Sequence, residues 1–127
     1  MILLCGMLLL VEDNAITRTA LAEALRTSGQ EVLEAGTAAE ALALLEANPV
    51  RLVVTDFVLP DLDGLKFMDL IHQRSARMPI ILISGYLSQR TGDAFLAASG
   101  KGAKFLPKPV RPSALLATVR ALLNSAS

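Results

Sequence analysis

Four apolar runs in this chain are each followed closely by side chains that could bind a cation or stabilise a phosphoryl group. These side chains are Glu12 and Asp13, Asp56, Ser84 and Lys108, which follow residues 7–11, 50–55, 79–83 and 103–106. Neighbouring carboxylates repel one another, and a hard divalent cation such as Mg²⁺ relieves that repulsion. A carboxylate can also act as a nucleophile, and an ammonium and a hydroxyl group can stabilise the phosphoryl charge that results. The set therefore predicts phosphoryl chemistry on Asp56.

Each of these residues has a plainer explanation when it is taken alone. Acids often follow strands because loops are polar, and Lys108 could be a solvated surface lysine. Ser84 stands before Gly85 and could simply belong to a turn. The joint pattern of acids, hydroxyl and lysine after four separate runs is much harder to explain by chance, so we interpret it as one site.

The elements that must position these side chains alternate strictly between strands and helices. Short apolar runs predict strands at residues 7–11, 31–35, 50–55, 79–83 and 103–106. Strands this apolar are typical of a parallel sheet that is covered by helices on both faces, which predicts an α/β, doubly wound (βα)5 fold. The carboxyl ends of parallel strands share one edge, where such folds hold their ligands. The polar side chains should therefore meet at that edge.

Helical spacing of apolar residues predicts five helices between and after the strands. Asn14 is a good N-cap for the first helix and Gly29 a plausible stop. Thr37 with Glu40 is a capping box for the second helix. The third runs through residues 65–72, and a weaker fourth covers residues 91–99 before the break at residues 100–102. Pro112 suits the first position of the last helix.

Composition excludes several classes of protein. The chain has 127 residues, which suits one domain, and a balance of 12 basic and 12 acidic residues without a basic stretch, which argues against direct nucleic-acid binding. The apolar start is too short to span a bilayer and lacks the basic region of a signal peptide. Cys5 is the only cysteine, which fits a reducing compartment. We expect a single cytoplasmic domain over residues 1–127, with residues 1–6 as an N-terminal extension.

Five short motifs resemble the receiver domain of bacterial response regulators in two-component signalling. They are Leu10-Val-Glu-Asp-Asn14, Thr55-Asp-Phe-Val-Leu-Pro60, Asp63-Gly64, Ile83-Ser-Gly85 and Phe105-Leu-Pro-Lys-Pro109. The resemblance extends over about residues 7–123, nearly the whole chain. It implies a flavodoxin-like, five-stranded parallel sheet with strand order 2-1-3-4-5 and helices on both faces, as in the chemotaxis regulators of this family.

The resemblance implies a role for each acid of the set. Asp56 would be the phosphoacceptor and would also bind the cation, Mg²⁺ or Mn²⁺. Asp13 would be a direct ligand of the cation, whereas Glu12 would reach it through water. The backbone carbonyl of Val58 would be the remaining protein ligand. Glu12 is longer than the aspartate that is more frequent in the family, but it keeps the charge.

The resemblance also implies a switch. Lys108, in a typically cis bond with Pro109, would pair with the phosphoryl group, and Ser84 would move to hydrogen-bond it. Phe105 matches the aromatic position that turns inward behind this hydroxyl residue. Phe105 has no ring hydroxyl, so its inward state should depend on apolar burial alone.

Val58 and Tyr86 each lie two residues beyond a key position, Asp56 and Ser84. In the family these two positions face the water that hydrolyses the phosphoryl group. An apolar Val58 and a bulky Tyr86 would hinder that water, which predicts slow autodephosphorylation. The alternative is that Tyr86 simply covers a loop.

The resemblance implies partners rather than a substrate. A histidine kinase or a phosphotransfer protein would donate the phosphoryl group, and a downstream protein or an attached output domain would receive the signal. The chain would catalyse only its own phosphorylation and dephosphorylation, so we do not class it as an enzyme. Residues 91–99, 103–106 and the last helix would form the mobile face and a possible homodimer contact. The chain could be a stand-alone receiver or part of a hybrid kinase or longer regulator.

Three other interpretations of the sequence remain open at this point. A degenerate receiver would bind its partner independently of phosphorylation, although the complete residue set argues against this. A flavoprotein of the same fold would want a Ser- and Gly-rich phosphate loop where the chain has Glu12-Asp-Asn14. An aspartyl-phosphatase would usually carry an acid where Val58 stands. His72 is the only histidine, and we interpret it as a surface or half-buried residue rather than a phosphodonor.

Overall fold

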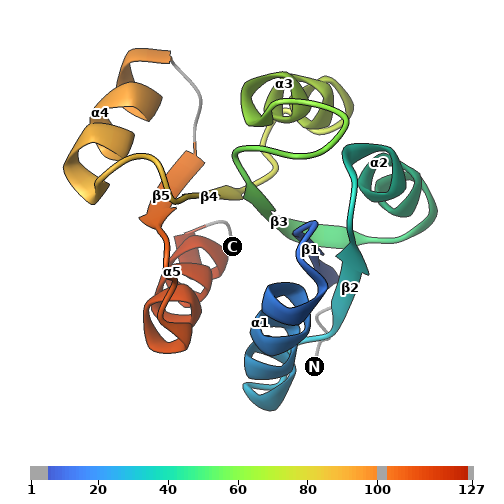
Figure 1. The fold of residues 1–127 in the computed structure, drawn as a ribbon. Coiled ribbons are helices and arrows are strands. Elements are labelled where there is room, and N and C mark those ends of the chain that lie inside the picture. The colour runs from blue at the N-terminus through green and yellow to red at the C-terminus, as the bar shows by residue number, and fades with distance from the viewer. Residues whose placement is uncertain (1–5, 100–102, 126–127) are drawn as a thin grey trace.

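The structure, a computed structural model, describes residues 6–99 and 103–125. Five strands and five helices alternate along the chain, as the sequence predicts (Figure 1). The strands are β1 (Met7–Val11), β2 (Val32–Ala35), β3 (Val50–Asp56), β4 (Ile80–Ser84) and β5 (Ala103–Pro107). The helices are α1 (Ala15–Thr27), α2 (Ala38–Ala47), α3 (Gly64–Arg74), α4 (Gln89–Ser99) and α5 (Pro112–Ser125). Every strand boundary lies within one residue of its prediction, because each strand is a short and mainly apolar run.

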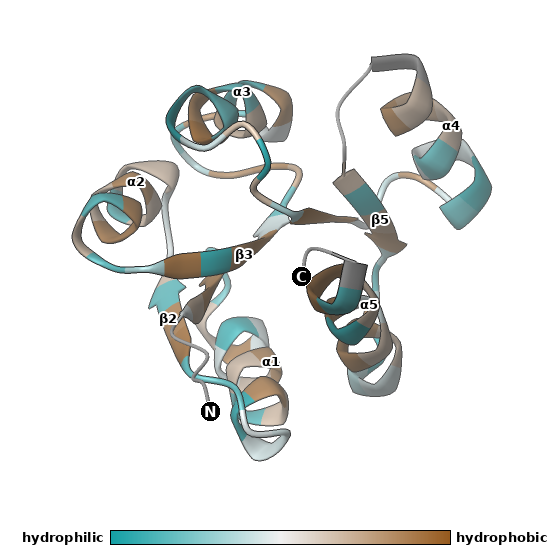
Figure 2. Cartoon of the chain, turned by 180° about the vertical axis from the view of Figure 1, so that it is seen from behind, coloured by the Kyte–Doolittle hydropathy of each residue, from teal (hydrophilic) through white to brown (hydrophobic). Residues whose placement is uncertain are grey.

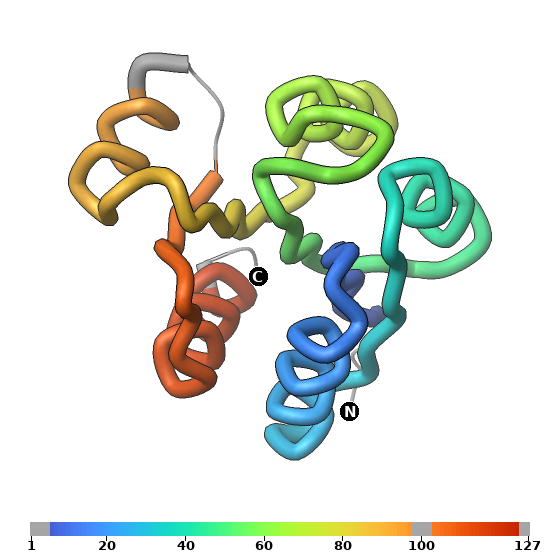
Figure 3. The backbone as a smooth tube through the Cα atoms, viewed as in Figure 1, coloured from blue at the N-terminus to red at the C-terminus, as the bar shows by residue number. Residues whose placement is uncertain are grey.

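The strands form one parallel sheet in the order β2-β1-β3-β4-β5. This confirms the flavodoxin-like order that the resemblance implies. Helices α1 and α5 cover one face of the sheet, and α2, α3 and α4 cover the other (Figure 1). The chain passes from strand to helix and back at every step (Figure 3). The carboxyl ends of all five strands therefore point to the same edge.

Two apolar layers hold the helices to the sheet. Side chains alternate between the faces of a strand, so Leu9 and Val11 of β1 join the layer under α2, α3 and α4. Leu8 and Leu10 join the opposite layer, under α1 and α5. Hydrophobic residues accordingly dominate the strands, whereas the helices carry both kinds (Figure 2). The central strands are buried on both faces, which fixes the backbone that carries the site.

Local signals in the sequence explain most helix ends. Asn14 Oδ1 accepts a hydrogen bond from Thr17 N at 2.9 Å, and Gly29, just after α1, has a φ of +97°. Both predictions are confirmed, as is Pro112 at the start of α5.

The predicted capping box of α2 is only partly correct. Thr37 Oγ1 accepts from Glu40 N at 3.1 Å, as expected. Glu40 Oε1, however, accepts from Gly36 N at 2.8 Å, one residue earlier than a capping box requires.

Helix α4 begins at Gln89, two residues before the predicted start. Ser88 provides the reason, because its Oγ accepts from Thr91 N at 3.2 Å and so caps the helix. The predicted helix break at residues 100–102 lies outside the described residues, as does most of the expected extension over residues 1–6.

The two outer strands each have a backbone carbonyl that a side chain covers. Arg26 Nη2 donates to Val32 O on β2 at 2.8 Å. On the opposite side of the sheet, Gln89 Nε2 donates to Phe105 O on β5 at 2.7 Å and to Asp93 Oδ1 at 2.9 Å. Among the described helices, none is long and apolar enough to cross a membrane.

Candidate functional site

The fold brings the predicted polar residues to the carboxyl edge of the sheet. Glu12 and Asp13 follow β1, Asp56 and Ser84 end β3 and β4, and Lys108 follows β5. The strands β1, β3, β4 and β5 are consecutive neighbours in the sheet, so the residues lie side by side. A cavity of about 190 Å³ opens there, and it is lined by Asp13, Asp56, Val58, Ile83, Ser84, Gly85, Tyr86 and Lys108.

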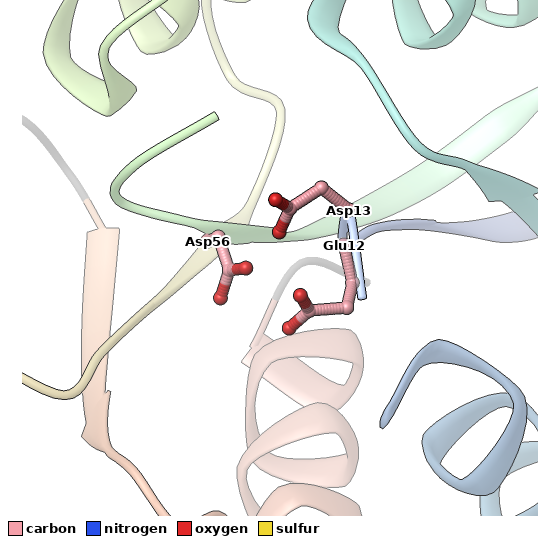
Figure 4. Close-up of side chains that lie close together, drawn as sticks. All are labelled: Glu12, Asp13 and Asp56. Atoms are coloured by element: carbon pink, nitrogen blue, oxygen red, sulfur yellow. The ribbon is translucent and has the colours of Figure 1, made fainter. Parts of the chain in front are cut away.

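Three carboxylates meet at this edge, as Figure 4 shows. One oxygen from each of Glu12, Asp13 and Asp56 lies within 4.8 Å of the others. The side chains of Glu12 and Asp56 are buried, with 2% and 3% of their residue surface exposed, whereas Asp13 is exposed. Buried carboxylates are costly unless they are paired or bind a cation, so this cluster is a candidate cation site.

Lys108 brings a positive charge to two of these carboxylates. Its Nζ lies 2.9 Å from Asp56 Oδ1 and 3.2 Å from Glu12 Oε1. The contact with Glu12 has hydrogen-bond geometry. The contact with Asp56 is an ion pair without that geometry, so among the described residues Asp56 Oδ1 is buried and accepts no hydrogen bond. The backbone places the lysine, because Lys108 N donates to Ser84 O at 2.8 Å. The Lys108–Pro109 bond is cis.

Burial sets the protonation of Asp56. Loss of hydration, together with a hydrogen bond to the neighbouring carboxyl of Glu12, raises the pKa of Asp56 to about 7, against the lowering effect of Lys108. Burial also opposes the charge of Glu12, but hydrogen bonds from Asp56, Asn14 N and Lys108 lower its pKa overall. The two carboxylates raise the pKa of Lys108, against the effect of its burial. The cluster thus holds more negative charge than its single lysine neutralises. That excess of negative charge, together with a buried Asp56 oxygen that accepts no hydrogen bond from the described residues, fits a hard divalent cation.

Two contacts orient Glu12. Asn14 N donates to its Oε2 at 3.0 Å, and Arg18 Nη1 donates to its backbone oxygen at 2.8 Å. Arg18 Nε also lies 3.4 Å from Glu34 Oε1 on β2. Sequence reasoning missed Arg18, because one arginine on the exposed side of a helix carries no signal of the strand end that it contacts.

The predicted switch residues are both buried. Ser84 is 3% exposed, and its Oγ accepts from Tyr86 N at 3.1 Å. Phe105 is 2% exposed, with its ring turned inward under α4. Gly92 of α4 makes room for this ring, since a Cβ at that position would lie 2.3 Å from Phe105 Cδ2. Gly92 was not identified from the sequence, where an isolated glycine in a helix has many explanations.

Val58 and Tyr86 both border the cavity and are exposed, at 54% and 82%. Asp13, Asp56 and Lys108 line the same cavity. His72 is half-buried near the end of α3, and its Nε2 lies 3.1 Å from Met78 O. This confirms its interpretation as a half-buried residue.

Curated relatives include both kinases and regulators. The chain is 35% identical to the sensor protein TorS of Escherichia coli over 112 residues and to the sensor kinase CckA of Brucella abortus over 120 residues. These matches cover 81% and 91% of the chain but only 11% and 12% of the two relatives. The response regulator MprA of Mycobacterium is 33% identical, over 94% of the chain and 51% of the relative. The chain thus spans about half of the length of MprA and about a tenth of the length of the other two relatives.

Solved structures and a family comparison agree with this result. A CheY-like response regulator receiver domain from Methanospirillum hungatei is 30% identical, with a TM-score of 0.83 and 96% of each chain covered. The receiver domain of the hybrid histidine kinase CckA is 32% identical, with a TM-score of 0.77 over 93% of this chain and 99% of that one. The model of the response regulator receiver domain matches residues 8–120. With the acidic edge, the shared fold and this match in agreement, the chain belongs to the response-regulator receiver-domain family.

Proposed function

We propose that this receiver domain accepts a phosphoryl group on Asp56 in a Mg²⁺-dependent reaction and passes the signal through α4, β5 and α5. The observation that carries the proposal is the geometry around Asp56. Its carboxylate is buried next to those of Glu12 and Asp13, and Lys108 Nζ lies 2.9 Å away. Receiver domains bind Mg²⁺ at an acidic cluster of this kind, and they interact with histidine kinases and output domains.

The proposed transfer is a single displacement at phosphorus. An oxygen of Asp56 attacks the phosphorus of a phosphohistidine, a P–O bond forms and the P–N bond breaks. The histidine leaves with the electron pair of that bond and takes up a proton. The attacking oxygen must be ionised, so Lys108 contributes before the reaction by lowering the pKa of Asp56.

The residues that would hold the cation are Asp13, Asp56 and the carbonyl of Val58, with Glu12 acting through water. When bound, Mg²⁺, or Mn²⁺ in its place, would neutralise charge on the carboxylates and on the phosphoryl oxygens. Lys108 can stay close to the phosphoryl group because its ammonium already lies at the acceptor. Ser84, which ends the neighbouring strand, would donate a hydrogen bond to a phosphoryl oxygen.

The donor would be a histidine kinase or a phosphotransfer protein of the cytoplasm. An apolar groove of about 530 Å³ runs beside Lys108 and is lined by Ile16, Thr17, Ala20, Leu21, Pro109, Val110 and Pro112. Ile16 is 83% exposed at the start of α1. A helix of the donor lying in this groove would bring its phosphohistidine close to Asp56.

The output surface would be the face of α4, β5 and α5, which could also form a homodimer. Phe105 lies buried on this face, next to Gly92. Phosphorylation would draw Ser84 toward the phosphoryl group and bias the position of Phe105 and α4.

Acetyl phosphate, with and without Mg²⁺, tests the acceptor. Intact-mass spectrometry should show one phosphoryl adduct only with Mg²⁺, and none in Asp56→Asn. Asp93→Asn is the matched control, because Asp93 lies on α4 away from the cluster and asparagine can still accept from Gln89. An adduct that persists in Asp56→Asn would contradict the assignment. A folded, Mg²⁺-binding protein without any adduct would instead favour the degenerate receiver, which binds its partner without phosphorylation.

Val58 and Tyr86 are proposed to slow the loss of the phosphoryl group. Their exposed side chains border the cavity and offer no carboxylate or amide to orient a water molecule. Val58→Asn and Tyr86→Ala should each speed the decay of the adduct several-fold, measured by mass against time. If the decay rate is unchanged in both variants, Tyr86 merely covers the loop.

A further inference from the structure

Asp61 joins two segments that are far apart in the sequence. It lies in residues 57–63, the segment between β3 and α3, and its two carboxylate oxygens accept hydrogen bonds from the start of α2. Oδ1 accepts from Ala38 N at 2.9 Å and Oδ2 accepts from Ala39 N at 3.0 Å. The first N–H groups of a helix have no partner within the helix, so a carboxylate there is favourable. The result is a two-point connection between this segment and α2.

Hydrogen bonds also connect residues 57–63 to the start of α3. Asp63 Oδ1 accepts from Lys66 N at 2.9 Å, and Gly64 N donates to Phe57 O at 2.6 Å. Val58 and Asp63 also form an isolated antiparallel bridge. The segment is therefore a closed loop, with Val58 at the acidic cavity and Asp61 at α2.

We infer that Asp61 is a positioning residue that holds the backbone carbonyl of Val58 in place for the cation. The inference rests on the proposed function, in which that carbonyl is a metal ligand. Without the Asp61 carboxylate, the segment would keep its attachment to α3 but lose these two hydrogen bonds to α2. A ligand that moves before binding must be ordered during binding, and this lowers the affinity for the metal.

A purely local role for Asp61, as a helix cap, makes a different prediction. Helix α2 already has its own cap, since Thr37 Oγ1 accepts from Glu40 N. Asp61 binds Ala38 N and Ala39 N, which Thr37 leaves free for it. If Asp61 served α2 alone, removing either cap should affect the cation site equally.

The test is Asp61→Asn in the full chain. Asparagine keeps one acceptor oxygen but places an amide NH₂ group against a backbone N–H, so one of the two hydrogen bonds is lost. We expect Mg²⁺ to bind about 3- to 10-fold more weakly, somewhat less than the loss usual for residues that contact a metal ligand directly. The readout is a Mg²⁺ titration followed by amide NMR at Asp13, Asp56 and Val58. In the metal-free protein, the amide signals of Ala38 and Ala39 should move as well.

Two variants separate this role from charge and from helix stability. Glu40→Gln removes one negative charge from the same end of α2 while leaving an oxygen for Gly36 N. Thr37→Ala removes the cap that belongs to α2 itself. Both should keep the Mg²⁺ affinity of the original chain at about 0.15 M salt, where charges more than about 8 Å apart are largely screened. Equal weakening in either variant would overturn the inference.

The failure of the inference and the failure of the proposed function look different. If the original chain shows no saturable Mg²⁺ binding, the proposed function is wrong and the inference falls with it. If the original chain binds Mg²⁺ and Asp61→Asn binds it equally well, only the positioning role is wrong. Circular dichroism of each variant confirms that a weaker affinity does not come from unfolding.

Discussion

Helices α3 and α4 cover the same face of the sheet, yet they are attached to it very differently (Figure 1). Helix α3 buries three large side chains, those of Phe67, Met68 and Ile71. Of the α4 residues whose burial is described, only Gly92 and Leu96 are buried, and glycine has no side chain to contribute apolar surface. Elements that move in a switch come from the less stable parts of a fold. The difference suggests that α3 is a fixed support and α4 the part that can shift.

An aromatic contact joins α4 to the segment between β3 and α3. The rings of Phe57, next to Asp56, and Phe95 of α4 lie 6.0 Å apart at an angle of 87°, an edge-to-face pair. Phe95 is still 37% exposed, so the contact can be broken at small cost. It connects the segment after β3 to α4 without fixing α4 in place.

Replacing one phenylalanine in each helix should show the largest difference between them. Phe67→Ala should lower the free energy of unfolding by about 3–5 kcal/mol, because Phe67 is fully buried. Phe95→Ala should lower it by only about 1 kcal/mol, the value of a partly exposed aromatic pair. Urea unfolding followed by circular dichroism measures both. Equal losses would show that α4 is anchored as firmly as α3.

The strand ends that precede the two helices should differ in their response to pH. Asp56, before α3, has a pKa raised to about 7, so in the range between its usual value and pH 7 the folded protein binds more protons than the unfolded protein. Without metal, the free energy of unfolding should therefore fall as pH rises from 5 to 8, by on the order of 2–4 kcal/mol.

Urea unfolding in EDTA across that pH range measures this effect. Asp56→Asn should remove most of the slope, and saturating Mg²⁺ should reduce it by favouring the ionised carboxylate. Ser84→Ala, at the strand end before α4, is the control that should keep the slope. If the free energy of unfolding of Asp56→Asn still falls with pH to the same extent, another titrating group causes the pH dependence.

Alanine substitutions at two buried glycines, Gly64 in α3 and Gly92 in α4, should change the free energy of unfolding by different amounts. A Cβ on Gly64, the first residue of α3, would lie 2.8 Å from the backbone oxygen of Phe57, which is held in the closed loop. Gly64→Ala should cost about 1–3 kcal/mol in unfolding free energy, as overpacking usually does.

A Cβ on Gly92 would instead meet the side chain of Phe105 rather than backbone atoms. Gly92→Ala also gains up to about 1 kcal/mol of helix propensity, so its net cost should be smaller. The Phe105 ring signals in NMR should shift, reporting a ring displaced from its place under α4. A larger loss in Gly92→Ala than in Gly64→Ala would reverse the comparison.

The smallest effect concerns an ion pair that ties α3 to α2. Arg74 Nη1 lies 2.8 Å from Glu46 Oε1, and both side chains are largely exposed. Glu46→Gln should lower the free energy of unfolding by no more than about 0.5 kcal/mol, and the loss should vanish at high salt. A loss above 1 kcal/mol, on the same urea assay, would mean that surface charge contributes to fixing α3.

The parts of the fold that the sequence predicts well are those set by local patterns. Short, mainly apolar runs locate every strand, and Asn14, Thr37 and Pro112 locate three helix starts. The meeting of Glu12, Asp13, Asp56 and Lys108 was also predicted, because parallel topology alone brings the ends of neighbouring strands together.

Other features depend on distances that no local pattern contains. The hydrogen bonds that Asp61 accepts from α2 join residues 22 and 23 positions apart, and the sequence around an acid in a turn does not show which helix that acid caps. The space that Gly92 leaves for the Phe105 ring depends on how closely α4 approaches β5. The lack of a hydrogen bond at Asp56 Oδ1 depends on the orientation of one ammonium group. These features are determined by how the helices and strands pack against one another.

The carbonyls of Val32 and Phe105, on the two outer strands, bear on whether this protein aggregates at high concentration. Leu8 N donates to Glu31 O and Lys108 N donates to Ser84 O, so the backbone carbonyls of the alternate residues Val32 and Phe105 point outward from the edges of the sheet. Such outward carbonyls invite strands of other molecules to add on, the first step of amyloid-like aggregation. The guanidinium of Arg26 and the amide of Gln89 occupy them at both margins. Aggregation by addition of a strand from another molecule is thereby opposed at each edge of the sheet.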